Sequence, residues 1–201
     1  MCTQPSVYIY WAIFVPEVVD QLPLIAAQVA LAYTLDGLLS WRRQGAWEFG
    51  FSPLPVVGSL NLFMWAKDEW WFLQIGMVAL AFLGREWIRW QRHGRSAHIF
   101  NPSGLALFVV AFGVLLTDST DITWGQFIAT TLNAPDHMFE TLFIAGIVVQ
   151  ALFSTTLVTM SAACTIWAGS LLWYGATGAW FFFDTHIPIS VFLGLTLLIT
   201  D

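Results

Sequence analysis

Charged side chains are scarce in this chain, and their scarcity excludes an ordinary soluble domain. Asp, Glu, Lys and Arg make up 10% of the 201 residues, whereas a soluble domain of this size has about 25%. Hydrophobic residues make up 58%, and the mean hydropathy is +0.71. One globular core cannot bury that much apolar surface, but a bilayer can accommodate it. We therefore predict an all-α, polytopic integral membrane protein.

Cysteines and soluble-enzyme motifs are also scarce. Cys2 and Cys164 lie far apart, so the sequence offers no disulfide framework and no Cys-x-x-Cys site. It has no Ser-His-Asp order, nucleotide-binding loop or zinc spacing, and its first residues lack a signal-peptide pattern. The net charge of −6 argues against nucleic acid as a partner. The expected partners are the lipid bilayer and other membrane subunits.

About seven or eight apolar segments alternate with polar loops. Residues 22–41 are long enough for a full crossing, and 138–153 and 157–174 come close. The other segments are short: 7–15, which is either a first crossing or an interfacial segment, then 54–66, 70–83, 102–116 and 187–200. A helix of 14 residues covers about 21 Å of a roughly 30 Å hydrocarbon core. The short segments therefore predict either helices with snorkelling polar ends or half-helices buried among neighbours, as in inverted-repeat folds.

The basic residues predict an orientation in a bacterial cytoplasmic membrane. All seven lie between positions 42 and 95, and six of them form two clusters, at 42–43 and 85–95. The clusters flank a pair of predicted helices, so they lie on one side, which the positive-inside rule makes cytoplasmic. Lys67 lies at the opposite tip beside two acidic residues. If successive segments cross the membrane in opposite directions, the loops 117–137 and 175–186 are outside, whereas the turn 154–156 and Asp201 are inside.

Asp36 lies inside the predicted span 22–41, where a carboxylate is costly and often functional. It is close to the cytoplasmic end, so it can pair with Arg42, Arg43 or the 85–95 cluster. An ion pair and a role in a site remain equally open. Three amide side chains nearer the middle of their segments are predicted to hydrogen-bond between helices: Gln28, Asn61 and Gln74.

Aromatic and histidine residues allow two interpretations each. Ten of the twelve tryptophans lie near predicted helix ends, at positions 41, 47, 65, 70, 71, 87, 90, 124, 173 and 180. An aromatic interface belt explains them, and stacking on a pigment or quinone is the alternative. His137 and His186 each lie within two residues of an aspartate. A metal or haem pair is conceivable, although exposed loop histidines are the simpler interpretation.

The stretch 85–104 carries most of the functional information. Arg85, Arg89 and Arg92 recur at helical spacing, which is typical of a cytoplasmic anchor on lipid phosphates. Asn101 is a good N-cap, and Pro102 suits the first position of a helix.

Ser103 and Gly104 keep the first turn of this predicted helix small. A helix start with Arg95 and His98 close by predicts an anion site, suited to a lipid head group, a flavin phosphate or an anionic quinone face. Taken alone, His98 is more simply a hydrogen-bonded structural group.

The motif "GRSAHIFNPS", residues 94–103, resembles the signature of the RnfD/NqrB family. These are membrane subunits of the Rnf and Na⁺-translocating NADH:quinone reductase complexes. The resemblance is closest to short members of the UnbU-like (enediyne-biosynthesis) type and extends to residues 27–41 and 187–201. It implies one transmembrane domain over 1–201, made of two related repeats with broken helices. Relatives continue with further helices, which indicates a truncated C-terminus at Asp201.

The resemblance also implies flavin-based electron transfer within a membrane complex, with quinone as a further partner. Some members carry FMN on a threonine in a Ser/Thr-Gly-Ala-Thr motif. Here "YGATGAW" offers Thr177, but Tyr174 replaces the hydroxyl residue. This departure, and the lack of a clear flavinylation motif in UnbU-like proteins, argue against covalent attachment and leave non-covalent FMN or riboflavin.

The candidate cofactor-binding residues are therefore Arg95, His98, Asn101, Ser103, Asp36 and Thr177. The first hypothesis is a redox subunit that passes electrons to a partner. The second is a non-catalytic accessory subunit of a larger respiratory or photosynthetic assembly. A channel or transporter built on broken helices is a weaker third.

Overall fold

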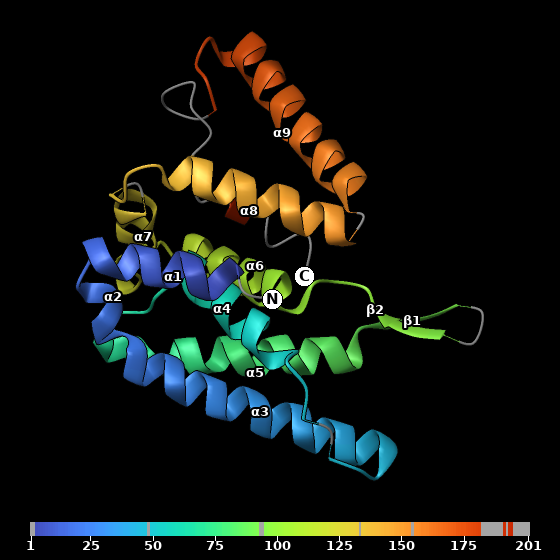
Figure 1. Cartoon of the computed structure of the whole chain (residues 1–201). Coiled ribbons are helices and arrows are strands. Elements are labelled where there is room, and N and C mark those ends of the chain that lie inside the picture. Colours follow the sequence, from blue (N-terminus) through green and yellow to red (C-terminus); the bar gives the residue numbers. More distant parts are fainter. Residues whose placement is uncertain are drawn as a thin grey trace. The chain divides into compact units, whose positions relative to one another are not determined.

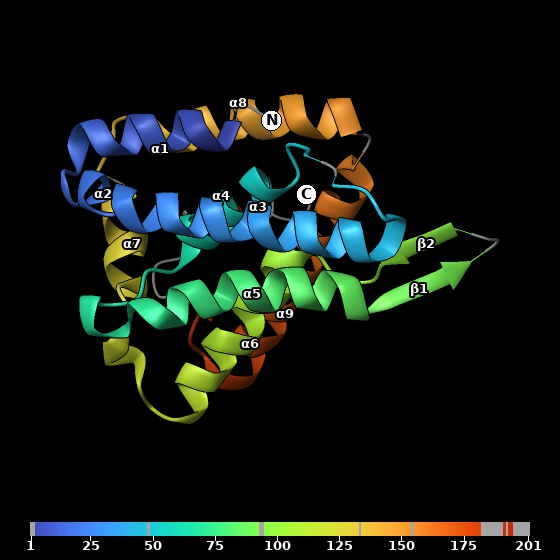
Figure 2. The same ribbon diagram turned by 90° about the horizontal axis from the view of Figure 1, so that it is seen from below.

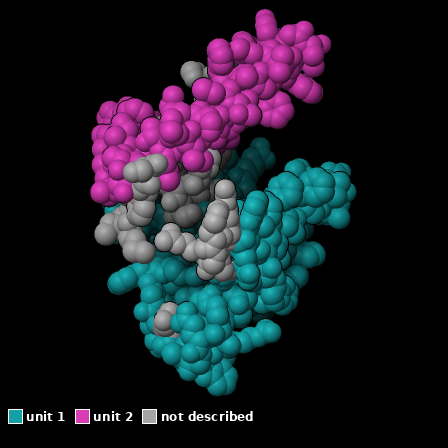
Figure 3. Space-filling model, turned by 90° about the vertical axis from the view of Figure 1, so that its right-hand side faces the viewer, with its two compact units in different colours: residues 1–131 teal, residues 132–201 magenta. Residues whose placement is uncertain are grey.

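The computed structural model describes residues 3–47, 49–92, 95–132, 134–153 and 155–181, and positions 191, 193 and 194, with only the backbone given at 3, 92, 95–97 and 153. About 78% of the described residues are helical, which confirms the all-α prediction (Figure 1). The chain divides into two compact units, residues 1–131 and 132–201, which have different colours in Figure 3.

Unit 1 contains seven helices, two short 3₁₀ turns and one hairpin among its described residues. In chain order they are α1 (Thr3–Phe14), α2 (Glu17–Asp20), α3 (Leu22–Gln44), α4 (Pro53–Phe63), η1 (Asp68–Trp70), α5 (Trp71–Trp87), β1 (Arg89–Arg92), β2 (Arg95–His98), α6 (Pro102–Leu116), η2 (Thr120–Ile122) and α7 (Gly125–Thr131). α5 packs against both α3 and α6, and α4 contacts α1, α3, α5 and α6. Figure 2 shows α3 and α5 side by side, with the hairpin projecting beyond the end of α5.

Helix ends in unit 1 follow local sequence signals. α3 has a proline in its first turn and ends at Gly45, which adopts the left-handed conformation with φ 71°. Arg42 and Arg43 occupy its last turn, where positive charge interacts favourably with the helix dipole. Gly84 lets α5 approach α6, because a Cβ there would lie 2.6 Å from Leu105 Cδ2.

α4 is a short helix surrounded by other helices. Its 11 residues span about 17 Å at 1.5 Å per residue. Val57, Leu60, Asn61 and Leu62 are at most 1% exposed. α4 is therefore a short helix buried among its neighbours. α6 differs, because side chains such as Phe108 and Leu116 leave one of its faces exposed.

Three buried amides, which we call the amide triad, join α3, α4 and α5. The Asn61 side-chain amide donates to Gln28 Oε1 at 2.6 Å and to the Val57 carbonyl at 2.8 Å. Gln74 Nε2 donates to Asn61 Oδ1, and Gln28 Nε2 donates to the Gln74 carbonyl at 3.2 Å. The Ala66 amide donates to Gln74 Oε1 at 3.1 Å. All three side chains are 0% exposed, so the predicted interhelical hydrogen bonds are confirmed.

Two loops meet at the end of unit 1 where α5 begins. The Lys67 amide donates to the Ile122 carbonyl at 2.9 Å, and the Trp124 amide donates to the Trp65 carbonyl at 2.7 Å. The Lys67 ammonium lies 5.3 Å from the centroid of the Trp124 ring, within the range of a cation–π contact. The segments 65–67 and 122–124 therefore lie at the same end of unit 1.

Two sequence-based interpretations are corrected. The helical spacing of Arg85, Arg89 and Arg92 does not continue as a helix, because α5 ends at Trp87 and residues 89–92 pair with 95–98 as antiparallel strands. Trp65 is not part of an interface belt. It is 1% exposed and stacks on buried Trp11, with ring centroids 5.0 Å apart. The other nine tryptophans near helix ends are exposed.

Unit 2 contains α8 (Met138–Phe153) and α9 (Thr156–Thr177). α9 ends at Gly178 in the left-handed conformation. Among the described residues, α3 and α9 are the two helices long and apolar enough to cross a membrane. Most of the predicted segment 187–200 lies outside the described residues, as does His186.

Stability should depend on the amide triad. Asn61→Leu keeps the side-chain size but leaves the Gln28 oxygen and the Gln74 amide without their partner. Each buried unsatisfied group costs about 1–3 kcal/mol, so the free energy of unfolding in detergent should fall by at least that much. Gln126→Leu also replaces an amide by leucine, but at an exposed position of α7, and it serves as the control. Equal effects of the two substitutions would contradict a structural role for the triad.

Candidate functional site

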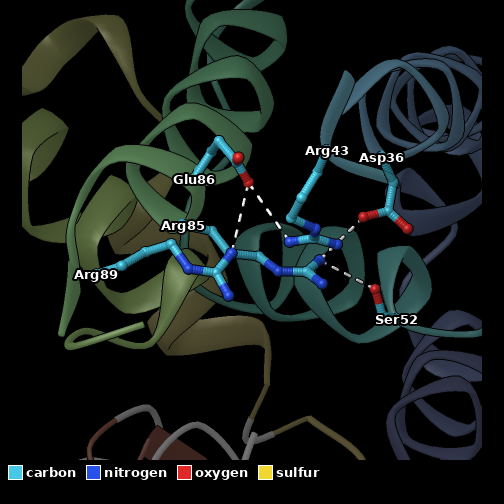
Figure 4. Close-up of polar contacts among 6 residues, drawn as sticks. All are labelled: Asp36, Arg43, Ser52, Arg85, Glu86 and Arg89. Atoms are coloured by element: carbon cyan, nitrogen blue, oxygen red, sulfur yellow. Dashed lines mark hydrogen bonds and ion pairs between the residues drawn. The ribbon is translucent and has the colours of Figure 1, made fainter. Parts of the chain in front are cut away.

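Polar side chains gather where α3 and α5 end, at the opposite end of unit 1 from the Lys67 loop. The Arg85 guanidinium donates to Asp36 Oδ1 at 3.1 Å and to Ser52 Oγ at 3.0 Å. Glu86 Oε2 lies 3.6 Å from Arg43 Nη1 and 3.5 Å from Arg89 Nη1. Figure 4 shows this basic-end cluster, which consists of Asp36, Arg43, Ser52, Arg85, Glu86 and Arg89.

Burial makes the Asp36–Arg85 pair stronger than an ordinary surface ion pair. The side chains are 14% and 28% exposed, so water screens them only in part. Asp36 thus pairs with the 85–95 cluster, one of the partners that the sequence allowed. Arg43 and Arg89 share Glu86, so the two carboxylates of the cluster contact three arginines and leave it with one positive charge in excess.

His98 ends the hairpin and pairs with Arg89 in the strand register. The Ile99 amide donates to the Ile88 carbonyl at 3.2 Å and closes the base of the hairpin. The pKa of His98 is lowered, first by partial desolvation and then by the positive charges of Arg85 and Arg89. The neutral imidazole is therefore favoured. Arg95 begins β2, but its side chain lies outside the described part of the chain.

The predicted cap of α6 is confirmed. Asn101 Oδ1 accepts a hydrogen bond from the Gly104 amide at 2.9 Å and one from the Ser103 hydroxyl at 2.7 Å. Pro102 occupies the first turn, and Ser103 is 1% exposed. Two donors share the cap oxygen, so Asn101 and Ser103 hold the helix start through their own contacts.

Thr177 lies in unit 2, in the last turn of α9. Its hydroxyl donates to the Trp173 carbonyl at 2.8 Å and lies 3.3 Å from the Ala179 amide, which donates to it. Tyr174, the residue in place of the motif hydroxyl, stacks on Trp180 with centroids 4.5 Å apart. The Thr177 hydroxyl is exposed but engaged by the backbone of its own helix end.

His137 is the one histidine of the predicted metal or haem pair that the structure describes. It lies in an exposed turn with φ 58° and is 3.6 Å from Glu140. In the part of the chain that the structure describes, no group of three or more His, Cys, Asp or Glu could hold a metal ion.

A cavity between α1, α3 and α4 was not predicted from the sequence. It has a volume of about 300 Å³, at the lower end of the roughly 300–1,000 Å³ of small-molecule sites. Gln4 and Tyr8 reach it from one face of α1, and Asn61 reaches it from α4. The available sequence signal was the spacing of four residues between Gln4 and Tyr8, which places both on the same helical face.

No family model, no curated protein and no solved structure matches this chain. The class of protein therefore rests on composition and fold. The chain is a mostly helical protein with two helices that could cross a membrane.

A double-mutant cycle should measure the Asp36–Arg85 pair. Asp36→Asn removes the negative charge and keeps the shape of the side chain. Arg85→Gln removes the positive charge and keeps a long polar side chain. We expect a coupling free energy of about 1–2 kcal/mol in chemical unfolding, above the range of exposed pairs. Arg42→Gln on the same helix end is the control for loss of a positive charge. A coupling near zero would mean that the pair contributes nothing to stability.

Proposed function

We propose that the chain is a multi-pass integral membrane subunit of the RnfD/NqrB type that works within a larger electron-transport complex of the bacterial cytoplasmic membrane. The single observation that carries this proposal is the segregation of charge along unit 1. Arginines gather at the end where α3 and α5 finish. Acidic residues surround the opposite loops, at Asp68, Glu69, Asp118 and Asp121. Apolar helices with an internally bonded amide triad separate the two ends.

The proposal includes seven or eight membrane segments, more than the two helices that have full crossing length. Buried α4 supports this number, because a short helix is tolerated at membrane depth when protein surrounds it. The exposed apolar faces of α6, α8 and α9 are suited to lipid or to neighbouring subunits. The basic end is cytoplasmic in this proposal.

Two roles within the complex follow from different observations. In the redox role, the start of α6 and the hairpin, with Asn101, Ser103, Arg95 and His98, hold an anionic group of a non-covalent flavin or a quinone. This role is supported by the resemblance of residues 94–103 to the family motif.

An accessory role is favoured by the contacts of the same region. Arg43, Arg85 and Arg89 already contact carboxylates. The Asn101 oxygen accepts from its own helix, and the Thr177 hydroxyl contacts its own backbone. These groups need no cofactor to satisfy them, so the geometry supports a subunit that packs within the complex better than one that carries electrons.

Cysteine labelling in intact cells should test the orientation. In a variant with Cys2 and Cys164 replaced by serine, Gln91→Cys in the hairpin should react with a membrane-impermeant maleimide only after permeabilisation. Thr120→Cys in the opposite loop should react in intact cells, because a charged reagent does not cross the bilayer. Both positions are exposed. The reverse pattern would overturn the orientation, and reaction of both in intact cells would overturn the membrane-spanning arrangement.

Flavin content should separate the redox role from the accessory role. If the chain carries electrons through flavin, the complex purified in mild detergent should release FMN or riboflavin on acid extraction. Asn101→Ala should lower that amount without dissociating the complex. A Thr177→Val variant is the matched control, since covalent attachment is not expected. A complex that assembles but releases no flavin, and shows no fluorescent band after denaturation, would exclude the flavin role and leave the accessory one.

A further inference from the structure

Positive charge is concentrated at the end of unit 1 where α3 and α5 finish. The segments 36–52 and 85–98 contain six arginines and three acidic residues, an excess of three positive charges. The rest of the chain contains one lysine and ten acidic residues. A protein that is acidic as a whole therefore has a basic surface at this one end, and such a surface attracts anions.

Part of this positive charge is not held by carboxylates of the chain. Asp36 and Glu86 contact three arginines and leave one positive charge in excess. Arg42 is exposed in the last turn of α3, and no carboxylate of the described residues lies within ion-pair distance of it. In the hairpin, the strand register places Arg92 opposite Arg95. Like charges at opposed positions destabilise an antiparallel pair, so an external anion would stabilise this end.

Exposed tryptophans accompany these arginines. Trp87 is 69% exposed, Trp90 59% and Trp41 56%, and they lie at the end of α5, in β1 and in the last turn of α3. The hairpin projects beyond the end of α5 (Figure 2). Ile88 and Ile99 add exposed aliphatic surface at its base. Tryptophan beside arginine is typical of surfaces that lie at the boundary between hydrocarbon and lipid head groups.

We propose that this basic and aromatic surface, formed by the end of α3 and the β1–β2 hairpin, binds the phosphates of anionic phospholipids in the adjoining leaflet. Arginine can donate two parallel hydrogen bonds to one phosphate. The inference rests on the proposed function for its membrane location, and it names a lipid class as the partner. RNA also suits arginine and aromatic rings, but Ile88 and Ile99 have no ring to stack on a base, and their exposed surface gains from contact with hydrocarbon.

Native mass spectrometry of the full chain, freed of lipid in a neutral detergent, tests the preference. Phosphatidylglycerol and phosphatidylcholine with the same acyl chains are added separately, and the bound lipids are counted by mass. The first phosphatidylglycerol should bind at least about 5-fold more tightly than the first phosphatidylcholine, because one arginine near an anionic head group contributes about that factor. Equal affinities for the two lipids would overturn the proposal.

Substitutions matched in charge locate the site. Arg42→Gln and Lys67→Gln each remove one positive charge, the first at the proposed surface and the second at the opposite end of unit 1. Arg42→Gln should weaken binding of the first phosphatidylglycerol about 5-fold and leave phosphatidylcholine unchanged, whereas Lys67→Gln should change neither. Replacing Arg92 and Arg95 by glutamine should weaken it further. An equal loss with Arg42→Gln and Lys67→Gln would mean that total charge, and not this surface, attracts the lipid.

A fluorescent reporter on the hairpin identifies the class of partner. In the variant with Cys2 and Cys164 replaced by serine, a bimane group on Gln91→Cys should emit at shorter wavelength in nanodiscs that contain phosphatidylglycerol than in phosphatidylcholine alone. If oligouridylate or polyglutamate causes this shift in phosphatidylcholine nanodiscs and phosphatidylglycerol does not, the partner is a soluble polyanion and the lipid assignment fails.

Failure of this inference is distinguishable from failure of the proposed function. If the chain spans the membrane but binds both lipids equally, the lipid surface is overturned and the proposed function stands. If the preference for phosphatidylglycerol holds but cysteine labelling in cells places the hairpin outside, the proposed orientation fails and the lipid surface stands.

Discussion

The structure of unit 1 depends on one constraint, which is that polar groups among apolar helices must bond to one another. Water is the usual alternative partner, and it is missing both in a packed core and in a bilayer. Gln28, Asn61 and Gln74 meet this constraint by bonding across three helices and to the loop at Ala66. Because each amide needs the other two at fixed distances, the triad sets the positions of α3, α4 and α5. A short helix such as α4 can therefore stay in place without the length that would let it cross a membrane alone.

The same constraint explains the basic-end cluster. Arg43, Arg85 and Arg89 lie at the end of an apolar bundle and are partly shielded from water, so a nearby carboxylate offsets the cost of burying their charge. Asp36 and Glu86 provide these carboxylates from α3 and α5. The cluster thereby ties the ends of two helices just before the chain turns into the hairpin. This contact also bears on function, since an arginine already held by a carboxylate is a weaker partner for an external anion than a free one.

Local sequence signals predicted much of the fold but little of the cavity. Asn101 and Pro102 gave the start of α6, since capping depends on neighbouring residues alone. The interhelical bonds of the amides were predictable in kind, because buried amides need partners, although their pairing was not. The strands at 89–98 were missed because arginines three and four residues apart fit a helix as well as a hairpin. Trp65 lies near a helix end in the sequence, and its burial against Trp11 depends on α1, which is distant in the chain. The cavity has the same origin, since three helices form it and no single segment contains its shape.

The cavity is a consequence of how the triad holds α4. Asn61 faces α3 and α5 through the triad, so α4 is fixed on that side, while α1 is held to it by the Gln4–Ser59 bond and by apolar contacts. Between these two attachments the helices do not close completely, and the space that remains is lined mainly by apolar side chains.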